Sequence, residues 1–200
     1  MVAPPSSPKR VGVLALQGDF EAHRKALAAS GAEVVEVRTA AELHGIDGLV
    51  IPGGESTTML KLLDAENLTG ALAEFGRGRP IFGTCAGAIL LAKGVTRPAQ
   101  ASLALMDIDV ERNAYGRQVD SRVTHISTEP EFGERTRPPA DLEAVFIRAP
   151  IIRRVGPGAR VLAWYQGDPV LVEQGKHLVA TFHPELTPDL RVHELFMSKL

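Results

Sequence analysis

The segment PIFGTCAGAILLA, residues 80–92, joins a short apolar run to a helix-forming stretch through Gly83-Thr84-Cys85-Ala86-Gly87. This order predicts a strand ending at Thr84 and a helix beginning directly after Cys85. Small residues on both sides of the cysteine are typical of a turn so sharp that a Cβ branch would clash. The start of a helix also favours negative charge, and therefore the thiolate. A lone cysteine is more often a buried core residue, but this setting favours a nucleophile.

The same alternation of apolar run and amphipathic segment extends toward the N-terminus. The expected strands are 11–17, 32–37 and 47–54, and the expected helices are 20–30, closed by Gly31 as its C-terminal cap, 56–76 in two pieces, and 86–94. Fully apolar strands that alternate with helices indicate a parallel sheet covered on both faces. We therefore predict an α/β fold of three layers, with a mostly parallel central sheet and helices on both faces.

The second half of the chain has strand-like segments without long helices between them. These segments are 102–113, 122–127, 142–149, 160–166, 169–175 and 177–185. They predict an antiparallel hairpin extension of the parallel sheet, with 128–142 as a mobile surface loop. A last helix is expected to begin with Thr187 as its N-cap and Pro188 at its first position. Residues 1–9 are expected to be a disordered lead-in, and residues 10–200 a single domain.

Composition excludes several classes of protein. The chain has 200 residues, a formal charge of -2 and one cysteine. The small net charge and the scattered basic residues argue against a nucleic-acid partner, and one cysteine excludes an internal disulfide framework and a multi-cysteine zinc site. The apolar runs are too short to cross a membrane, and the start, MVAPPSSPKR, lacks the apolar stretch of a signal peptide. We expect a cytoplasmic protein with no membrane partner.

A nucleophilic cysteine needs a base and a group that orients the base. Six histidines are present, and five of them read as solvated or structural. His183 differs because LVATFHPE brings a buried strand to its end with His183, Pro184 and Glu185. Residues i and i+2 of an extended segment project to the same side, so Glu185 is expected to hold the imidazole while its other nitrogen faces Cys85. A surface turn would be the simpler interpretation of HPE alone.

Acyl transfer also requires donors for the oxyanion that develops in the transition state. The backbone N–H of Ala86 is one candidate. A second is the loop in VIPGGEST, residues 50–57, where Gly53 and Gly54 allow the backbone to approach a substrate closely. This loop follows the third expected strand, beside the cysteine strand. A tight turn or a phosphate-binding nest are the alternatives, although the P-loop pattern is absent.

These motifs together resemble the class I glutamine amidotransferases, and within them the glutaminases that serve pyridoxal 5'-phosphate synthase. The resemblance rests on GVLALQGDFEAH, LVIPGGESTTM, PIFGTCAGAILLA, VERNAYGRQ, AVFIRAP and ATFHPEL, and so covers nearly the whole chain from Val11. It implies the fold of that class and the hydrolysis of L-glutamine to glutamate and ammonia. The ammonia would pass to a separate synthase subunit that builds pyridoxal 5'-phosphate, the active form of vitamin B6, and neither a cofactor nor a metal is implied.

The resemblance also implies roles for particular residues. Cys85 corresponds to the nucleophile, His183 to the base and Glu185 to the group that orients it. The residues at glutamine-contacting positions are Gly53, Gly54, Glu55, Arg112, Ile147 and Arg148. The carboxylate of glutamine favours a guanidinium partner, although surface charge alone would also account for the arginines. The resemblance further implies low activity until the synthase docks, with 17–19 and 53–58 as candidate contact segments.

Three alternatives remain at this point. An α/β-hydrolase with a cysteine at its strand-to-helix nucleophile turn would have its acidic residue before its histidine in the sequence, whereas Glu185 follows His183. A redox or chaperone domain of similar architecture would use Cys85 for sensing. A binding subunit without activity would have no reason to keep all three groups of the triad.

Overall fold

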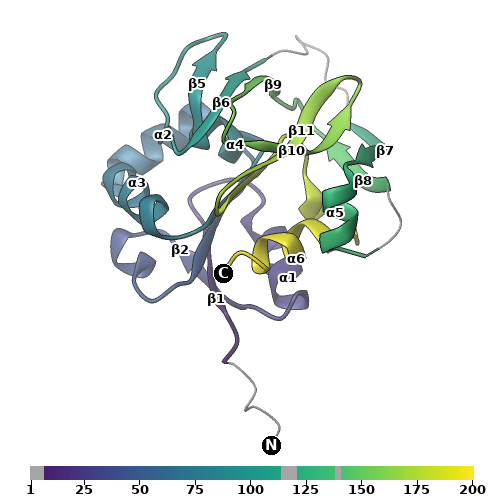
Figure 1. Ribbon diagram of the computed structural model, residues 1–200. Helices are drawn as coiled ribbons and strands as arrows, with labels where there is room; N and C mark the ends of the chain where they lie inside the picture. The colour runs from purple at the N-terminus through teal and green to yellow at the C-terminus, as the bar shows by residue number, and fades with distance from the viewer. Residues whose placement is uncertain (1–6, 114–120, 138–140) are drawn as a thin grey trace, which may run out of the picture.

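The computed structural model (Figure 1) describes residues 7–113, 121–137 and 141–200. Most of the expected lead-in, residues 1–6, and part of the motif VERNAYGRQ, residues 114–118, lie outside the described residues. Among the helices that the structure describes, none is long and apolar enough to span a membrane.

The central sheet joins five parallel strands to four antiparallel ones. Its order is β2 (Glu33–Val37), β1 (Arg10–Leu14), β3 (Gly48–Ile51), β4 (Ile81–Thr84), β12 (His177–Ala180), β11 (Asp168–Gln174), β10 (Arg160–Tyr165), β7 (Arg122–Thr128) and β8 (Asp141–Phe146). The first five strands in this order, β2, β1, β3, β4 and β12, are parallel to one another. The remaining four, β11, β10, β7 and β8, each run antiparallel to their neighbours. The α/β prediction is confirmed. The last strand-like segment, 177–185, was expected to belong to the antiparallel extension. Its strand β12 pairs antiparallel with β11 but also pairs parallel with β4, so it belongs to the parallel part of the sheet as well.

Successive side chains of the parallel strands point to opposite faces, and each face has its own core. Leu49 and Ile51 belong to one core, while Val50 between them belongs to the other. The first face is covered by α2 (Ser56–Ala65), α3 (Leu68–Gly78), α4 (Ala86–Leu91) and the 3-10 turn η1 (Ala40–Leu43), and the second by α1 (Phe20–Ala29), α5 (Pro130–Arg135) and α6 (Arg191–Met197). Figure 1 shows α2 and α3 on one side of the sheet and α1 and α6 on the other.

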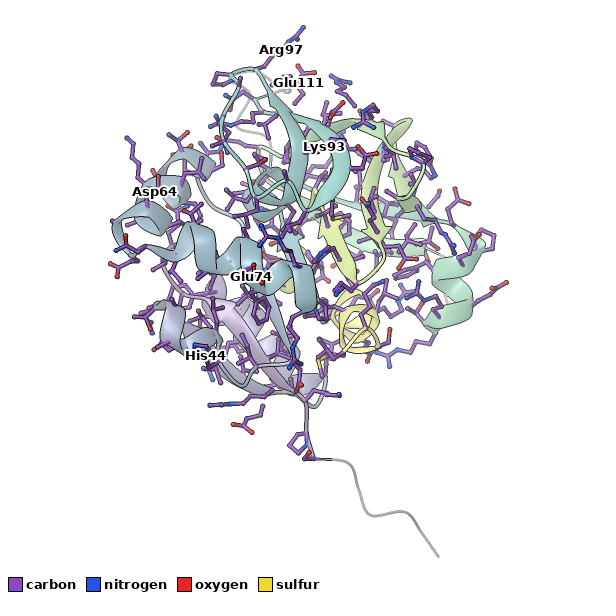
Figure 2. The ribbon with its side chains drawn as sticks, turned by 60° about the vertical axis from the view of Figure 1, so that its left-hand side comes forward. His44, Asp64, Glu74, Lys93, Arg97 and Glu111 are labelled. Carbon is purple, nitrogen blue, oxygen red and sulfur yellow. The ribbon has the colours of Figure 1, made fainter. Side chains whose placement is uncertain are left out.

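A smaller sheet of β5 (Ala92–Thr96), β6 (Met106–Glu111) and β9 (Ile151–Val155) packs on the first face. Figure 2 shows Arg97 and Glu111 together at one end of this sheet, where their side chains form an ion pair of 2.9 Å. Arg153 approaches the other oxygen of Glu111 at 2.6 Å. These ion pairs fix the end of β6, from which the chain continues directly into Arg112.

Several predicted boundaries are confirmed. Helices α2 and α3 are the two expected pieces, and Gly31 follows α1 with φ +88. The N–H of Gly31 donates to the carbonyl of Ala28, as expected of a glycine C-terminal cap.

Other predicted boundaries were wrong. Residues 128–142 are not simply a mobile loop, because α5 lies within them and its Phe132 is fully buried. The helix expected over 86–94 ends at Leu91, where β5 begins and pairs with β6. The last helix begins at Arg191 rather than after Thr187, because Thr187 instead closes the 3-10 turn η2 (Pro184–Leu186).

Candidate active site

Cys85 lies at the junction of β4 and α4, with the unusual backbone angles φ 48 and ψ -104. The expected need for small neighbours is confirmed by the space around them. A Cβ added to Gly83 would lie 2.5 Å from the backbone of Gly87, and one added to Gly87 would lie 2.2 Å from the Ile51 carbonyl oxygen. The turn therefore excludes larger residues, and it presents the one thiol of the chain at the carboxyl end of the sheet.

His183 and Glu185 lie beside Cys85. The Nδ1 atom of His183 is 2.7 Å from Oε1 of Glu185, and Cys85 lies close enough to the imidazole to raise its pKa. The expected contact between His183 and Glu185 is present, but the extended backbone that was expected to produce it is not. Pro184–Leu186 form a 3-10 turn rather than an extended segment, and this turn brings the carboxylate back beneath the ring.

The protonation of His183 reflects these two neighbours. Burial alone would lower the pKa of His183, but hydrogen bonds with Cys85 and Glu185 and the negative charges of both raise that pKa to about 10. The protonated imidazole is therefore the favoured form at neutral pH, placed between a sulfur and a carboxylate.

The loop Gly53-Gly54 approaches the same three residues. A Cβ added to Gly53 would lie 2.5 Å from Cε1 of His183 and 3.2 Å from Cβ of Cys85. The Gly53 carbonyl faces Gly18, since a Cβ at Gly18 would lie 1.8 Å from its oxygen. Because a trans peptide places its C=O and N–H on opposite sides, the N–H of Gly54 points away from Gly18. The amide of Gln17 donates to the Glu55 carbonyl at 3.0 Å, which links residues 17–19 to this loop.

The carboxylate of Glu55 caps α2. It accepts hydrogen bonds from the backbone N–H groups of Thr57 and Thr58 at 2.9 and 2.7 Å. Partial burial raises the pKa of Glu55, but these bonds and those of the threonine hydroxyls outweigh burial and lower it to about 2. Arg112 donates to the Thr57 hydroxyl at 2.8 Å and lies 3.4 Å from Glu55. The two charged groups are thus held in fixed positions.

A cavity of about 180 Å³ opens over Cys85. It is lined by Gly54, Glu55, Ser56, Cys85, Ile89, Arg112, Asn113, Ile147, Arg148, Pro150 and His183. The structure therefore brings together Cys85, His183 and the expected contact residues, with Gly53 directly behind them. Ser56, Ile89, Asn113 and Pro150 were not named as site residues, although each lies in or beside one of the motifs on which the resemblance rests. The volume suits a small polar molecule such as an amino acid.

The other histidines divide into two groups. His44 and His125 are exposed, as expected of solvated residues, whereas His23, His177 and His193 are buried. His23 lies 3.2 Å from Glu185, and its other ring nitrogen lies 3.0 Å from His193. Within the described ranges, no cluster of three or more histidine, cysteine or acidic side chains has the arrangement of a metal site.

Comparison of the sequence with known proteins gives consistent matches. Residues 13–200 match the family described as "SNO glutamine amidotransferase family". The chain is 66% identical over 192 residues to the "Pyridoxal 5'-phosphate synthase subunit PdxT" of Solibacter usitatus, covering 96% of this chain and 100% of that one. It is 55% identical to the protein of the same name from Koribacter versatilis, covering 94% of each chain.

Solved structures show the same relationship. A crystal structure described as a glutamine amidotransferase superposes with a TM-score of 0.84 at 45% identity, over 94% of this chain and 97% of that one. A glutamine amidotransferase from Thermotoga maritima has a TM-score of 0.63 at 15% identity, over 98% of this chain and 85% of that one. The second match shows a shared fold alone.

Proposed function

The chain belongs to the SNO glutamine amidotransferase family, and from this premise we propose that residues 10–200 form the glutaminase subunit of a pyridoxal 5'-phosphate synthase. The observation that carries the proposal is the meeting of Cys85, His183 and Glu185 beneath a cavity walled by two arginines. A hydrolase or redox domain of another family would not account for the matches over nearly the whole sequence.

In the first half of the proposed reaction, the thiolate of Cys85 attacks the side-chain amide carbon of glutamine. The carbonyl π electrons move to oxygen, which becomes an oxyanion. The N–H of Ala86 is a suitable donor to this oxyanion, because the first N–H groups of a helix have no partner within the helix. The N–H of Gly54 is the second donor. Protonated His183 then gives its proton to the departing nitrogen, so that ammonia leaves and a thioester remains.

In the second half, neutral His183 removes a proton from water, and the resulting hydroxide attacks the thioester carbon. A second oxyanion forms on the same donors and collapses with cleavage of the C–S bond, which releases the Cys85 thiolate and the γ-carboxylic acid and leaves His183 protonated. The carboxylic acid then loses its proton to solvent and becomes glutamate. Glu185 stabilises the protonated ring and fixes its orientation throughout, as the acidic member of a triad does.

The charged groups of the cavity match the charges of free glutamine. Arg148 is exposed at the rim, and Arg112 lies in the wall. A guanidinium binds a carboxylate through paired hydrogen bonds, so we assign the α-carboxylate of glutamine to these arginines. Glu55, which stays charged because of its lowered pKa, is assigned to the α-ammonium group, and Ile147 to the methylene groups of the substrate.

Ammonia becomes protonated at neutral pH and loses its nucleophilicity, so a partner that receives it directly is chemically sensible. Segments 17–19 and 53–58 are proposed to contact the synthase subunit. They contain exposed residues and are joined by the hydrogen bond between Gln17 and Glu55. A synthase that presses on either segment would act directly on the Gly53-Gly54 loop.

The proposal is tested by measuring ammonia release from L-glutamine by this chain alone and with a pyridoxal 5'-phosphate synthase subunit. We expect hydrolysis specific for glutamine over asparagine, with a higher rate when the synthase is present. Equal rates with and without the synthase would refute activation by docking. No hydrolysis under either condition would refute the glutaminase assignment.

Replacement of Gly18 by alanine tests the role of the Gly53-Gly54 peptide. The added Cβ would overlap the Gly53 carbonyl oxygen at 1.8 Å, so that peptide must move. Loss of one oxyanion donor lowers kcat by about 10²-fold or more, and we expect a loss of that size in steady-state assays. Gly31→Ala is the matched control, because Gly31 has a similar φ of +88 but no atom within 4 Å of the added Cβ. Equal activity in both variants would contradict the role of this peptide.

A further inference from the structure

A pair of buried histidines adjoins Glu185 through one of its members. His23 of α1 and His193 of α6 are both fully buried, and Nδ1 of His23 is 3.0 Å from Nε2 of His193. The other nitrogen of His23, Nε2, is 3.2 Å from Oε2 of Glu185 and 3.0 Å from the hydroxyl of Thr84. The proposed mechanism uses only the opposite oxygen of Glu185, so this pair has no role in it.

Both rings are neutral at physiological pH. Burial, together with the nearby charges of His193 and His183, lowers the pKa of His23 well below its ordinary value, and burial lowers the pKa of His193 to about 4. Each neutral imidazole carries one proton. The hydrogen bond between the rings therefore has two possible directions, and they place different atoms against Glu185.

The surroundings favour one direction. If His23 donated to His193, the bare Nε2 of His23 would face a carboxylate oxygen, and Nδ1 of His193 would carry a buried proton without an acceptor among the described residues. If His193 donates to His23 instead, Nδ1 of His193 is only an unused lone pair, and His23 presents Nε2–H to Glu185 and Thr84. A buried donor without a partner costs about 1–3 kcal/mol, so the second arrangement is the stable one.

The second oxygen of Glu185 needs such a donor. The side chain of Glu185 is fully buried, and within the described part of the chain its Oε2 has no hydrogen-bond partner. A buried carboxylate with one oxygen that lacks a hydrogen-bond donor is energetically costly. The Nε2 atom of His23 lies 3.2 Å from this oxygen, close enough to donate after a small rotation of the ring, although in this structure its hydrogen bond is with the Thr84 hydroxyl.

We propose that His23 is a positioning residue of the active site, which donates from Nε2 to Oε2 of Glu185 and is itself fixed by the N–H of His193. This inference rests on the proposed function of the triad and extends it by one residue on α1 and one on α6. The carboxylate is held from both sides, by His183 on the cavity side and by His23 on the core side. The alternative is a pair of core histidines that only satisfy each other.

The test uses two amide replacements of His23 that differ in reach. The amide of glutamine places its nitrogen near the position of Nε2, so His23→Gln keeps a donor for Glu185. The shorter amide of asparagine corresponds to Nδ1, so His23→Asn keeps the contact with His193 and loses the one with Glu185. Both variants exchange a buried ring for an amide, so thermal unfolding provides the check that they lose similar stability.

Two readouts are measured, with the synthase present for the first. We expect His23→Asn to lower kcat for glutamine by about 10-fold or more while KM stays within about twofold, the pattern of an interaction made in the transition state. His23→Gln is expected to recover most of kcat. The second readout is the alkylation rate of Cys85 by iodoacetamide, which needs no glutamine and is unambiguous because the chain has one cysteine. It is expected to fall in His23→Asn and to recover in His23→Gln.

Equal alkylation rates in the two variants, or equal values of kcat, would overturn the positioning role. A wild-type chain that hydrolyses no glutamine, with alkylation still dependent on the side chain at 23, would overturn the proposed function and leave this inference standing. Should His23→Asn fail to fold, His193→Phe replaces it, because it removes the donor that fixes the tautomer of His23. Unchanged alkylation in that variant would also contradict the proposal.

Discussion

Replacement of Cys85 by alanine is expected to abolish glutamine hydrolysis, with a fall in kcat of about 10⁴-fold or more, as for the nucleophile of other triads. No other thiol is present to replace it. The thioester cannot form, and His183 alone has no covalent route to the amide carbon. Ammonia release in the presence of the synthase subunit measures the effect.

The fold and the synthase contact are expected to survive this change. Alanine fits the space of the cysteine, and the tight contacts of the turn belong to Gly83 and Gly87. Thermal unfolding and co-purification with the synthase provide the controls. Full activity in Cys85→Ala would remove the nucleophile assignment, whereas loss of synthase binding would show that the residue also supports the structure.

Replacement of Glu185 by glutamine is expected to lower kcat by about 10³-fold, less than the loss of the nucleophile, because the base remains but is wrongly oriented. The neutral amide no longer stabilises the protonated ring of His183. The amide has a single acceptor oxygen, so it cannot accept hydrogen bonds both from His183 and from the proposed donor on His23.

The same variant changes the titration of His183. In the wild type, Cys85 and Glu185 raise the pKa of His183 to about 10 against the effect of burial, so the ring stays protonated until the pH approaches that value. Without the charge of Glu185 the pKa falls, and the ring loses its proton at lower pH. The ring proton resonances of His183, followed by NMR against pH, measure this shift. An unchanged titration would show that another group holds the imidazole.

The sequence was sufficient for the parts of the site that depend on short-range patterns. Gly83 and Gly87 around Cys85 mark the turn, because the backbone there leaves no space for a side chain. The alternation of Val50 between Leu49 and Ile51 was predictable as a buried strand, since both faces of a parallel sheet are covered. These features follow from local sterics and from burial.

The sequence was insufficient where tertiary contacts decide the environment of a side chain. His23 lies in a segment rich in charge and was interpreted only as a solvated or structural histidine, yet α6 packs against α1 and His23 is completely buried beside the site. Phe132 belongs to a proline-rich segment that was predicted to be a loop, yet its side chain is fully buried in the core. Glu185 reaches His183 through a 3-10 turn that Pro184 begins, which no periodic pattern reveals.

The most direct test of the covalent mechanism is labelling with a chloroketone analogue of L-glutamine, followed by mass spectrometry of the digested protein. The analogue carries an electrophilic carbon beyond a side chain that resembles that of glutamine, so it should be held by the same cavity. The mechanism predicts one adduct, on Cys85, that forms more slowly as L-glutamine is added. An adduct elsewhere, or labelling of Cys85 at a rate that glutamine does not change, would contradict it.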